Sequence, residues 1–322
     1  MAEAAVRTVL LVVVGPTAVG KSAFALAACE RFGGEVVSVD SMQVYRGLDA
    51  ATSKPGPADR ARAPHHGLDM ADPGDDFSMG DFVRFAEGAI AGIAGRGRLP
   101  VLVGGTGLYL RALLRGVAEA PRRVPRLRER LRAVGERRGV PFLHRMLRRL
   151  DPEGALRLPP NDRQRIVRAL EVRFAGGRPL GEMLRERPFG ADRYDAIKIG
   201  LDMDRARLYR RIDARVDRFF AAGLVDEVRG LLAAGRPAAA NAFKALGYRE
   251  VAAHLRGERT LEDTVALTRR NTRRYAKRQL TWFRAEPGVT WFSIDADAAG
   301  PFTAPLEHAG RELRTRGMGA WA

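Results

Sequence analysis

The stretch Gly15-Pro16-Thr17-Ala18-Val19-Gly20-Lys21-Ser22 fits the phosphate-binding pattern G-x-x-x-x-G-K-[ST] at every fixed position. An unbroken apolar run over residues 9–14 precedes it and is typical of a buried parallel strand. A segment rich in helix-forming residues follows over residues 22–28. Because the pattern lies between a strand and a helix, the sequence predicts an α/β protein built around a phosphate loop.

The residue types of this loop suit an anion. Gly15 and Gly20 permit backbone angles that let successive N–H groups point at a phosphate, and the start of the following helix adds positive potential. Lys21 supplies a mobile charge, and the hydroxyl of Ser22 is a ligand for Mg²⁺. We therefore expect Mg²⁺ as a cofactor, with Ser22 as its protein ligand. The pattern does not distinguish ATP or GTP from an organic diphosphate.

The composition is that of a globular protein. Hydrophobic residues make up 46% of the 322 residues and charged residues 29%. No apolar run approaches the roughly 20 residues that a membrane span needs, and no signal-peptide pattern is present. The single cysteine, Cys29, excludes internal disulfides and multi-cysteine zinc modules. We expect a cytoplasmic protein without a membrane partner.

Positive charge is concentrated in two segments. The formal net charge is +17, and residues 121–190 contain 19 Arg and no Lys against eight acidic residues, a net charge of +11. Residues 268–284 carry seven Lys or Arg and no acidic residue, with Tyr275, Trp282 and Phe283 among them. This distribution indicates contact with a polyanion such as nucleic acid, whereas solvated helix faces are the alternative. Each aromatic, taken alone, fits core packing better than base stacking.

Two further strands are expected near the phosphate loop. Residues 36–40 form a short apolar segment that ends on Asp40, and the carboxyl ends of parallel strands line the ligand crevice. Asp40 is therefore expected beside the phosphate loop. Residues 99–103 form the next strand, but it ends in Gly104-Gly105-Thr106-Gly107, where a kinase or ATPase usually carries an acidic residue for Mg²⁺. This absence argues against nucleotide hydrolysis.

The rest of the chain changes in composition and predicted secondary structure along its length. Residues 121–190 are arginine-dense and helical, with no strand candidate, and residues 196–201 resume the strand pattern. Helices are also expected over residues 78–90, 204–228 and 268–284, and a last strand at Trp291 and Phe292. The predicted fold is a P-loop NTPase-like parallel sheet flanked by helices. Its predicted domains are an α/β core (1–120), an all-helical basic insertion (121–190) and a return to the core with basic helices (191–322).

The chain resembles the bacterial tRNA dimethylallyltransferases, also called isopentenyl-tRNA transferases. Besides the phosphate loop, the segments that carry the resemblance are Ser38-Val39-Asp40-Ser41-Met42-Gln43-Val44-Tyr45, Val103-Gly104-Gly105-Thr106-Gly107-Leu108-Tyr109, Asn161-Asp162-Arg163-Gln164-Arg165 and Lys277-Arg278-Gln279-Leu280-Thr281-Trp282. The phosphate loop occurs in many families, whereas the second and third of these segments together are far more selective.

The resemblance implies a reaction and a set of residues. It implies transfer of a dimethylallyl group from dimethylallyl diphosphate to the exocyclic amine of the adenosine 3′ to the tRNA anticodon, so that the phosphate loop holds the diphosphate. It implies Asp40 as the general base, with Thr17 and Arg215 near the diphosphate. Separately, we expect the protein to be a monomer. The residues implied to contact the tRNA anticodon stem-loop are Asp40, Ser41, Met42, Gln43, Thr106, Arg128, Gln164, Arg165, Ile166, Val167 and Arg168.

Three alternatives remain open from the sequence. A small-molecule kinase would use Asp40 to activate a hydroxyl, but the missing strand-end acid and the basic helices argue against it. An isopentenyltransferase that acts on free adenine nucleotides would use the same core chemistry without needing the basic insertion. An RNA-binding module without catalytic activity would leave the phosphate loop and Asp40 unexplained.

Overall fold

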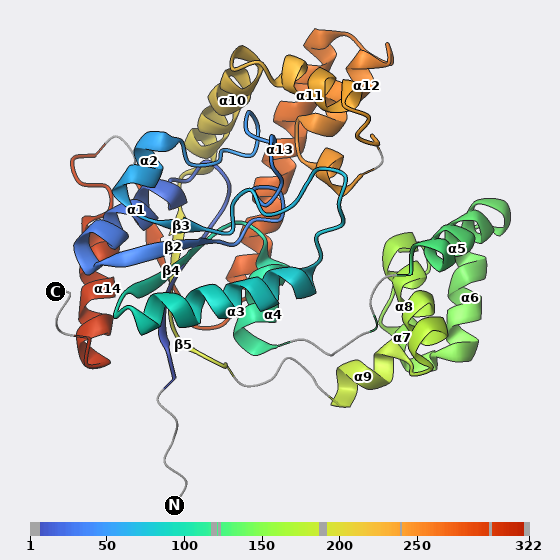
Figure 1. Ribbon diagram of the computed structural model, residues 1–322, viewed down its shortest axis with the longest axis horizontal. Coiled ribbons are helices and arrows are strands. Elements are labelled where there is room, and N and C mark those ends of the chain that lie inside the picture. The colour runs from blue at the N-terminus through green and yellow to red at the C-terminus, as the bar shows by residue number, and fades with distance from the viewer. Residues whose placement is uncertain are drawn as a thin grey trace, which may run out of the picture. The chain divides into compact units, whose positions relative to one another are not determined.

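Six parallel strands form one sheet in the computed structural model, which describes residues 7–116, 121, 124–186, 192–238, 240–295 and 298–318 (Figure 1). The chain divides into two compact units. The first, here called the P-loop unit, comprises Met1–Leu114 and Tyr194–Ala322 and contains the sheet. The second, here called the helical unit, comprises Arg115–Arg193.

The sheet has the order β3-β2-β4-β1-β5-β6. Its strands are β1 (Val9–Val14), β2 (Gly34–Ser38), β3 (His65–His66), β4 (Leu99–Val103), β5 (Asp195–Asp202) and β6 (Val289–Ser293). The strands predicted from the apolar runs are confirmed, and the fold is the predicted α/β class. β2 ends two residues before Asp40, although its ladder continues to Val39, whose N–H donates to the Val103 carbonyl at 2.8 Å. β3 has only two residues and is not visible in the apolar pattern.

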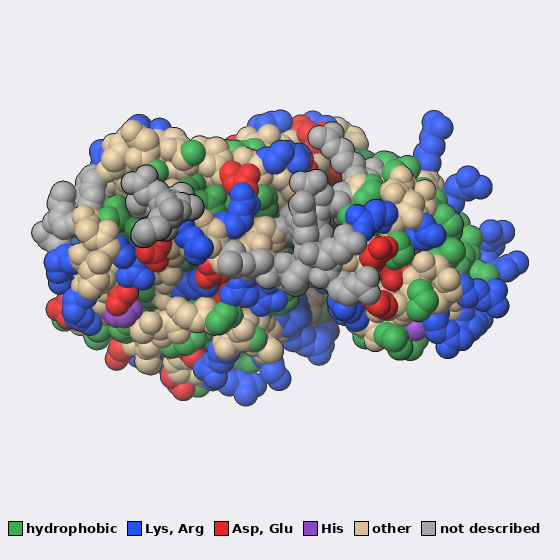
Figure 2. All heavy atoms as spheres, turned by 90° about the horizontal axis from the view of Figure 1, so that it is seen from below, with side chains coloured by type: hydrophobic (Ala, Val, Ile, Leu, Met, Phe, Trp, Pro, Cys, Tyr) green, Lys and Arg blue, Asp and Glu red, His purple; other side chains and the backbone are tan. Residues whose placement is uncertain are grey.

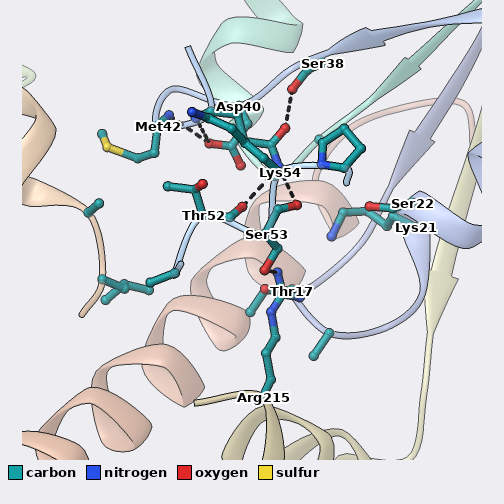
Figure 3. A pocket seen from close by; sticks show the side chains of 18 of the residues that line it. Thr17, Lys21, Ser22, Ser38, Asp40, Met42, Thr52, Ser53, Lys54 and Arg215 are labelled. Carbon is teal, nitrogen blue, oxygen red and sulfur yellow. Dashed lines mark hydrogen bonds between the residues drawn. The ribbon is translucent and has the colours of Figure 1, made fainter. Parts of the chain in front are cut away.

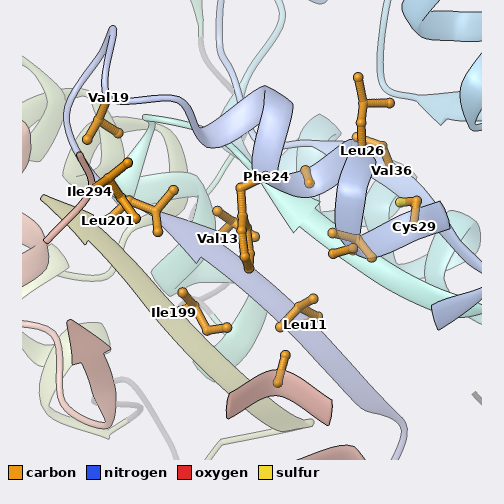
Figure 4. Packing of buried hydrophobic residues seen from close by; sticks show 14 of the residues in the cluster. Leu11, Val13, Val19, Phe24, Leu26, Cys29, Val36, Ile199, Leu201 and Ile294 are labelled. Carbon is orange, nitrogen blue, oxygen red and sulfur yellow. The ribbon is translucent and has the colours of Figure 1, made fainter. Parts of the chain in front are cut away.

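The central strand β1 is buried on both faces. Leu11 and Val13 pack in a cluster with Phe24 of α1 (Lys21–Phe32), Ile199 of β5 and Ala309 of α14 (Thr303–Thr315), part of which Figure 4 shows. The intervening residues Leu10 and Val12 are buried as well, which explains the unbroken apolar sequence. This rigid strand places the phosphate loop that follows it.

Several helices of the P-loop unit depart from the expected ranges, and the one expected at 78–90 continues to Gly95. The expected helix at 204–228 is two helices, because Gly223 takes a left-handed φ of 88° between them. The expected helix at 268–284 begins seven residues earlier, where the Thr260 side chain caps it, and a further helix, α14, follows it. The helices are α1 (Lys21–Phe32), α2 (Pro57–Arg62), α3 (Met79–Gly95), α4 (Gly107–Arg115), α10 (Arg205–Ala221), α11 (Leu224–Ala233), α12 (Tyr248–Leu255), α13 (Leu261–Arg284), α14 (Thr303–Thr315) and the 3₁₀ helix η1 (Asn241–Lys244).

The helical unit has its own small core. Leu131, Leu143, Ile166 and Leu170 are among the apolar side chains that pack there. Its helices are α5 (Pro125–Arg138), α6 (Val140–Leu150), α7 (Pro152–Leu156), α8 (Arg163–Gly176) and α9 (Leu180–Glu186). Lys and Arg side chains crowd the outer edge of this unit, at the right of Figure 2. Across the described part of the chain, no helix has the length and apolar character required to cross a bilayer.

Candidate functional site

A cavity of about 970 Å³ opens at the carboxyl ends of the central strands, within the P-loop unit. It is lined by the phosphate loop, by the segment after β2, by residues 49–55 and by α10 and α13. Figure 3 shows Lys21, Asp40, Ser53 and Arg215 brought to this cavity from separate segments. Its position agrees with the general rule that α/β sheets bind ligands beyond the carboxyl ends of their strands.

The phosphate loop joins β1 to α1 in a conformation that requires its glycines. Gly15 has a φ of 141°, and a Cβ there would lie 2.3 Å from the Leu201 carbonyl oxygen. Gly20 has a φ of 114° and precedes α1 without a side-chain cap. The first N–H groups of α1 therefore have no side-chain acceptor at the N-cap, as expected for a helix start that receives an anion.

Lys21 is desolvated beside a second cation. Its Nζ donates to the Pro16 carbonyl at 2.7 Å. Burial, with a smaller contribution from the positive charge of Arg215, lowers the pKa of Lys21 to about 7, while Asp40 acts in the opposite direction. An anion in the cavity would compensate for the proximity of the two cations.

Arg215 projects from α10 and is held by the loop at residues 49–55. Its guanidinium donates to the Ser53 hydroxyl. Burial lowers the pKa of Arg215 to about 10, and Asp40 partly offsets this effect. One turn earlier on α10, Arg211 donates through Nε to the Ala18 carbonyl at 3.0 Å. Thus α10 contacts the phosphate loop itself and places Arg215 on the same cavity.

Asp40 lies where the chain turns after β2. Its carboxylate accepts from the N–H of Met42 at 2.8 Å and from the N–H of Gln43 at 3.4 Å, and this turn ends the strand. Burial raises the pKa of Asp40, while these two N–H groups and the charges of Lys21 and Arg215 act to lower it. A carboxylate with a raised pKa beside two cations is suited to accept a proton in the cavity.

Gln43 lies in the same turn and spans two segments. Its Oε1 accepts from the Ser38 hydroxyl at 2.8 Å, and its Nε2 donates to the carbonyls of Thr52 and Ser53 at 3.0 and 3.1 Å. Ser53 has a left-handed φ of 54° and also accepts from Arg215. One short loop therefore supports both Gln43 and Arg215.

The glycines after β4 allow close contacts that exclude an acidic residue there. A Cβ at Gly104 would lie 2.0 Å from the Val39 carbonyl oxygen, and one at Gly107 would lie 2.1 Å from Nε1 of Trp282. Thr106 follows with its N–H donating to Val39 at 3.2 Å and its hydroxyl accepting from the Ser41 N–H at 3.1 Å. The Gly104–Thr106 segment therefore packs directly on the Asp40 turn.

In the helical unit, Arg128 and Arg168 meet at Glu171, whose side chain is fully buried. Their guanidinium groups lie 2.6 and 2.9 Å from Glu171 Oε2, and Oε1 accepts from the Val124 N–H at 2.8 Å. Burial raises the pKa of Glu171, but these hydrogen bonds and charges outweigh it and lower the pKa. The Nε of Arg128 is buried and has no hydrogen-bond acceptor among the described residues.

The remaining predicted tRNA-contact residues divide by exposure. Gln164 and Arg165 are exposed on α8, and Arg165 pairs with Asp162 at 2.5 Å. Ile166 and Val167 have only 0% and 3% of their surfaces exposed, and both pack in the core of the helical unit. Their side chains therefore hold α8 in the helical unit, and their predicted contact with tRNA stays a prediction that would have to involve the backbone.

Three functional candidates were missed at the sequence level. Gln279 and Ser53 bridge segments around the cavity, and Glu171 orients two arginines. Gln279 lies within Lys277–Trp282, one of the segments that carry the resemblance, and it is an uncharged polar residue on a basic helix. That signal could have identified Gln279, whereas no local pattern distinguishes Ser53 or Glu171.

A preformed all-protein metal cluster is absent from the described ranges, which contain no group of three or more His, Cys, Asp or Glu side chains suited to hold an ion. Ser22 is exposed to the cavity beside Lys21. A single hydroxyl fits Mg²⁺ that takes its other ligands from substrate phosphates and water.

The sequence comparisons agree with one another. The profile of the family described as IPP transferase matches residues 43–286. A tRNA dimethylallyltransferase of Geobacter metallireducens is 49% identical over 285 residues, which cover 88% of this chain and 92% of that protein. A tRNA dimethylallyltransferase of Anaeromyxobacter dehalogenans is 51% identical over 288 residues, which cover 89% and 96%.

Solved structures are similar over nearly the whole chain. A tRNA isopentenylpyrophosphate transferase from Bacillus halodurans has a TM-score of 0.71 and 38% identity, covering 97% of this chain and 98% of its own. A eukaryotic dimethylallyltransferase acting on tRNA has a TM-score of 0.82 and 25% identity, covering 96% and 80%.

Proposed function

The chain belongs to the IPP transferase family, and from this premise we propose that it moves a dimethylallyl group from dimethylallyl diphosphate to tRNA. The acceptor is the exocyclic amine of the adenosine 3′-adjacent to the anticodon, and diphosphate is released. One observation carries the proposal: the phosphate loop, Arg215 and the carboxylate of Asp40 line a single cavity. The cavity therefore offers cationic groups for the diphosphate of the donor and a carboxylate for the amine of the acceptor.

On the donor side, the allylic C–O bond breaks and diphosphate leaves with the bonding electrons. The proposed diphosphate-binding residues are Gly15 to Ser22, which include Thr17, and Arg215 of α10 lines the same cavity. Lys21 and Arg215 face the growing negative charge, and preorganised cations of this kind commonly contribute several kcal/mol to such a step, about 3–4 per group. When bound, Mg²⁺ on Ser22 would neutralise diphosphate oxygens further.

On the acceptor side, the amine nitrogen forms the new C–N bond and loses a proton. The lone pair of an adenine amine is delocalised into the ring, so proton removal must accompany attack, and Asp40 is the proposed acceptor. The Gln43 N–H donates to the Asp40 carboxylate, and the Thr106 hydroxyl accepts from the N–H of the adjacent Ser41. With Met42 these residues form the proposed pocket for the base. The base must leave its stack to enter such a pocket.

The helical unit is the proposed grip on the anticodon stem-loop. Gln164 and Arg165 are exposed there on α8, and Arg128 of α5 and Arg168 of α8 are held at Glu171 in the same unit. We further propose that the working form is a monomer and that the protein acts in the cytoplasm.

A paired transfer assay tests the proposal. Purified protein, Mg²⁺ and unmodified tRNA with adenosine 3′ to the anticodon receive either labelled dimethylallyl diphosphate or labelled ATP. We expect label from dimethylallyl diphosphate to enter the tRNA with stoichiometric release of diphosphate. Consumption of ATP alone would overturn the proposal in favour of a kinase, and equal transfer to free adenosine monophosphate would overturn the tRNA assignment.

A further inference from the structure

Gln279 of α13 forms hydrogen bonds to two loops of the cavity at once. Its side-chain Oε1 accepts from the N–H of Thr17 in the phosphate loop at 2.8 Å. Its Nε2 donates to the carbonyl of Gly105 after β4 at 3.1 Å. Only 4% of the residue is exposed, so one buried amide joins loops that lie far apart in the sequence.

The surroundings of this amide are shaped to receive it. A Cβ on Gly105 would lie 2.0 Å from the Nε2 of Gln279, so the absence of a side chain at position 105 makes the contact possible. Tyr275, one turn earlier on α13, approaches the same Gly105 carbonyl with its hydroxyl at 3.4 Å. The contact is therefore part of how α13 packs against the segment after β4.

From Gly105 the hydrogen bonds continue to the proposed general base. The next residue, Thr106, donates through its N–H to the Val39 carbonyl at 3.2 Å, and its hydroxyl accepts from the Ser41 N–H at 3.1 Å. Val39 and Ser41 flank Asp40. Gln279 thus links the loop proposed to hold diphosphate with the turn that carries the base.

The helix that carries Gln279 is anchored by buried side chains. Ala276 and Phe283, on the same helix, are 0% and 1% exposed. Two side-chain hydrogen bonds hold the Gln279 amide in one orientation, which reduces the freedom of both loops relative to each other.

We propose that Gln279 is a positioning residue that sets the separation and orientation of the phosphate loop relative to the Asp40 turn. The inference rests on the proposed function, because that reaction needs the acceptor nitrogen aligned with the allylic carbon and its departing diphosphate. Near-attack alignment of this kind is sensitive to shifts of about 1 Å, which can reduce rate about 100-fold. Gln279 itself touches neither reacting atom in this account.

The test uses Gln279→Met, which keeps the length of the side chain and removes both hydrogen bonds. We expect kcat to fall about 100-fold, with the KM for each substrate changed less than about threefold. We also expect more diphosphate released than prenyl groups transferred, because water can attack the misaligned donor and give dimethylallyl alcohol and diphosphate. A purely structural role would lower the melting temperature without changing this ratio.

A second variant reaches the same contact from the other side. Gly105→Ala places a methyl group against Nε2 and should displace the Gln279 amide. If both substitutions act through one contact, the double variant loses little more activity than the more impaired single variant. Full multiplication of the two losses would overturn the shared contact. Gly105→Ala also keeps the inference testable if Gln279→Met does not fold.

Thr268→Val is the matched control on the same helix. Thr268 is 0% exposed, and its hydroxyl donates to the Thr264 carbonyl within the same helix. We expect it to lower stability slightly while kcat and the release ratio stay at the wild-type values. If the wild type is active and the Gln279→Met variant keeps kcat within about threefold of it, the inference is overturned but the proposed function stands. A wild type that transfers no prenyl group would overturn the proposed function, and the inference with it.

Discussion

Burial acts in opposite directions on the two ionisable side chains at the centre of the cavity. It raises the pKa of Asp40 and lowers the pKa of Lys21 to about 7, because each group loses hydration in its charged form. The negative charge of Asp40 acts to raise the pKa of Lys21, and the positive charge of Lys21 acts to lower the pKa of Asp40. A bound diphosphate adds negative charge beside Lys21 and should hold its proton to higher pH.

These shifts predict a bell-shaped dependence of kcat/KM for dimethylallyl diphosphate on pH. As pH rises past about 7, Lys21 loses its proton before the donor binds, so kcat/KM falls. As pH decreases through the pKa of Asp40, which lies above its ordinary 3.8, the base becomes protonated and kcat/KM falls again. Initial rates between about pH 5 and 9 measure both limbs. The kcat itself should persist to higher pH, because bound diphosphate retains the Lys21 proton.

Asp40→Asn checks the assignment of the acidic limb. The amide cannot accept the amine proton, so kcat should fall about 10²–10⁴-fold and the acidic limb should disappear. The alkaline limb should move below pH 7, because Asp40 raises the pKa of Lys21 in the wild type. A thiolo-analogue of dimethylallyl diphosphate should still bind. An unchanged acidic limb in this variant would show that another group is the base.

At the scale of elements, α5 and α8 are joined through the buried carboxylate of Glu171. Because its pKa is lowered in the folded protein, it contributes stability above about pH 4.5, and this is lost as pH falls through the lowered pKa. Arg128 and Arg168 take their orientation from this one carboxylate. The proposed RNA-facing surface therefore depends on an acidic residue that never reaches the surface.

Glu171→Gln should destabilise the helical unit by about 2 kcal/mol, because charge-assisted hydrogen bonds to two arginines are weakened. The KM for tRNA should rise, while the affinity for dimethylallyl diphosphate stays unchanged. Thermal unfolding and tRNA titration measure the two effects. As pH falls below about 4.5 the stability difference should shrink, and it should be smallest below the lowered pKa of Glu171, where the wild-type carboxylate is protonated in the folded protein too.

Glu136→Gln is the control for that substitution. Glu136 pairs with Arg163 on the same two helices, but its side chain is 66% exposed. An exposed pair contributes about 0–1 kcal/mol, so little change is expected. Equal losses in the two variants would show that the buried position of Glu171 has no special role.

The elements that the sequence predicted well are those fixed by local pattern. β1 and the phosphate loop follow directly from the apolar run and the two glycines, and Ser78 with Asp81 forms a capping box at the start of α3. The break at Gly223 was missed because amphipathic spacing continues across it. The short strand β3 was missed because it is defined by its pairing with β2.

The site was predictable where one residue carries the chemistry, and not where contacts between distant segments do. Asp40 at a strand end could be expected beside the phosphate loop. The bonds of Gln279 to Thr17 and Gly105 depend on how α13 packs on the sheet.

The three aromatic residues of α13 have different environments. Trp282 lies under the guanidinium of Arg111 at 4.4 Å and Phe283 is buried, so only Tyr275 of the three aromatics lines the cavity.

Across the whole molecule, the basic segments differ in how much of their positive charge is already paired with acidic side chains. Residues 121–190 carry a net charge of +11 out of +17. The basic helix α13 has partners that its sequence alone does not reveal, since Arg269 pairs with Asp217 and Arg273 with Asp213 on α10. We therefore expect the salt dependence of tRNA binding to depend more on the helical unit than on these two arginines of α13.

Arg165→Ala tests this expectation against a matched control. Arg165 is 62% exposed and pairs with Asp162 three residues before it, and Arg84 of α3 is 61% exposed and pairs with Asp81 in the same spacing. If Arg165 contacts a phosphate, its removal should weaken tRNA binding and reduce the slope of log K against log salt by about 0.7–0.9. Arg84→Ala should leave the slope unchanged. Fluorescence anisotropy between about 50 and 200 mM salt measures both variants. Equal slope changes would indicate a general charge effect, and an unchanged slope for Arg165→Ala would mean that this face of α8 does not contact RNA.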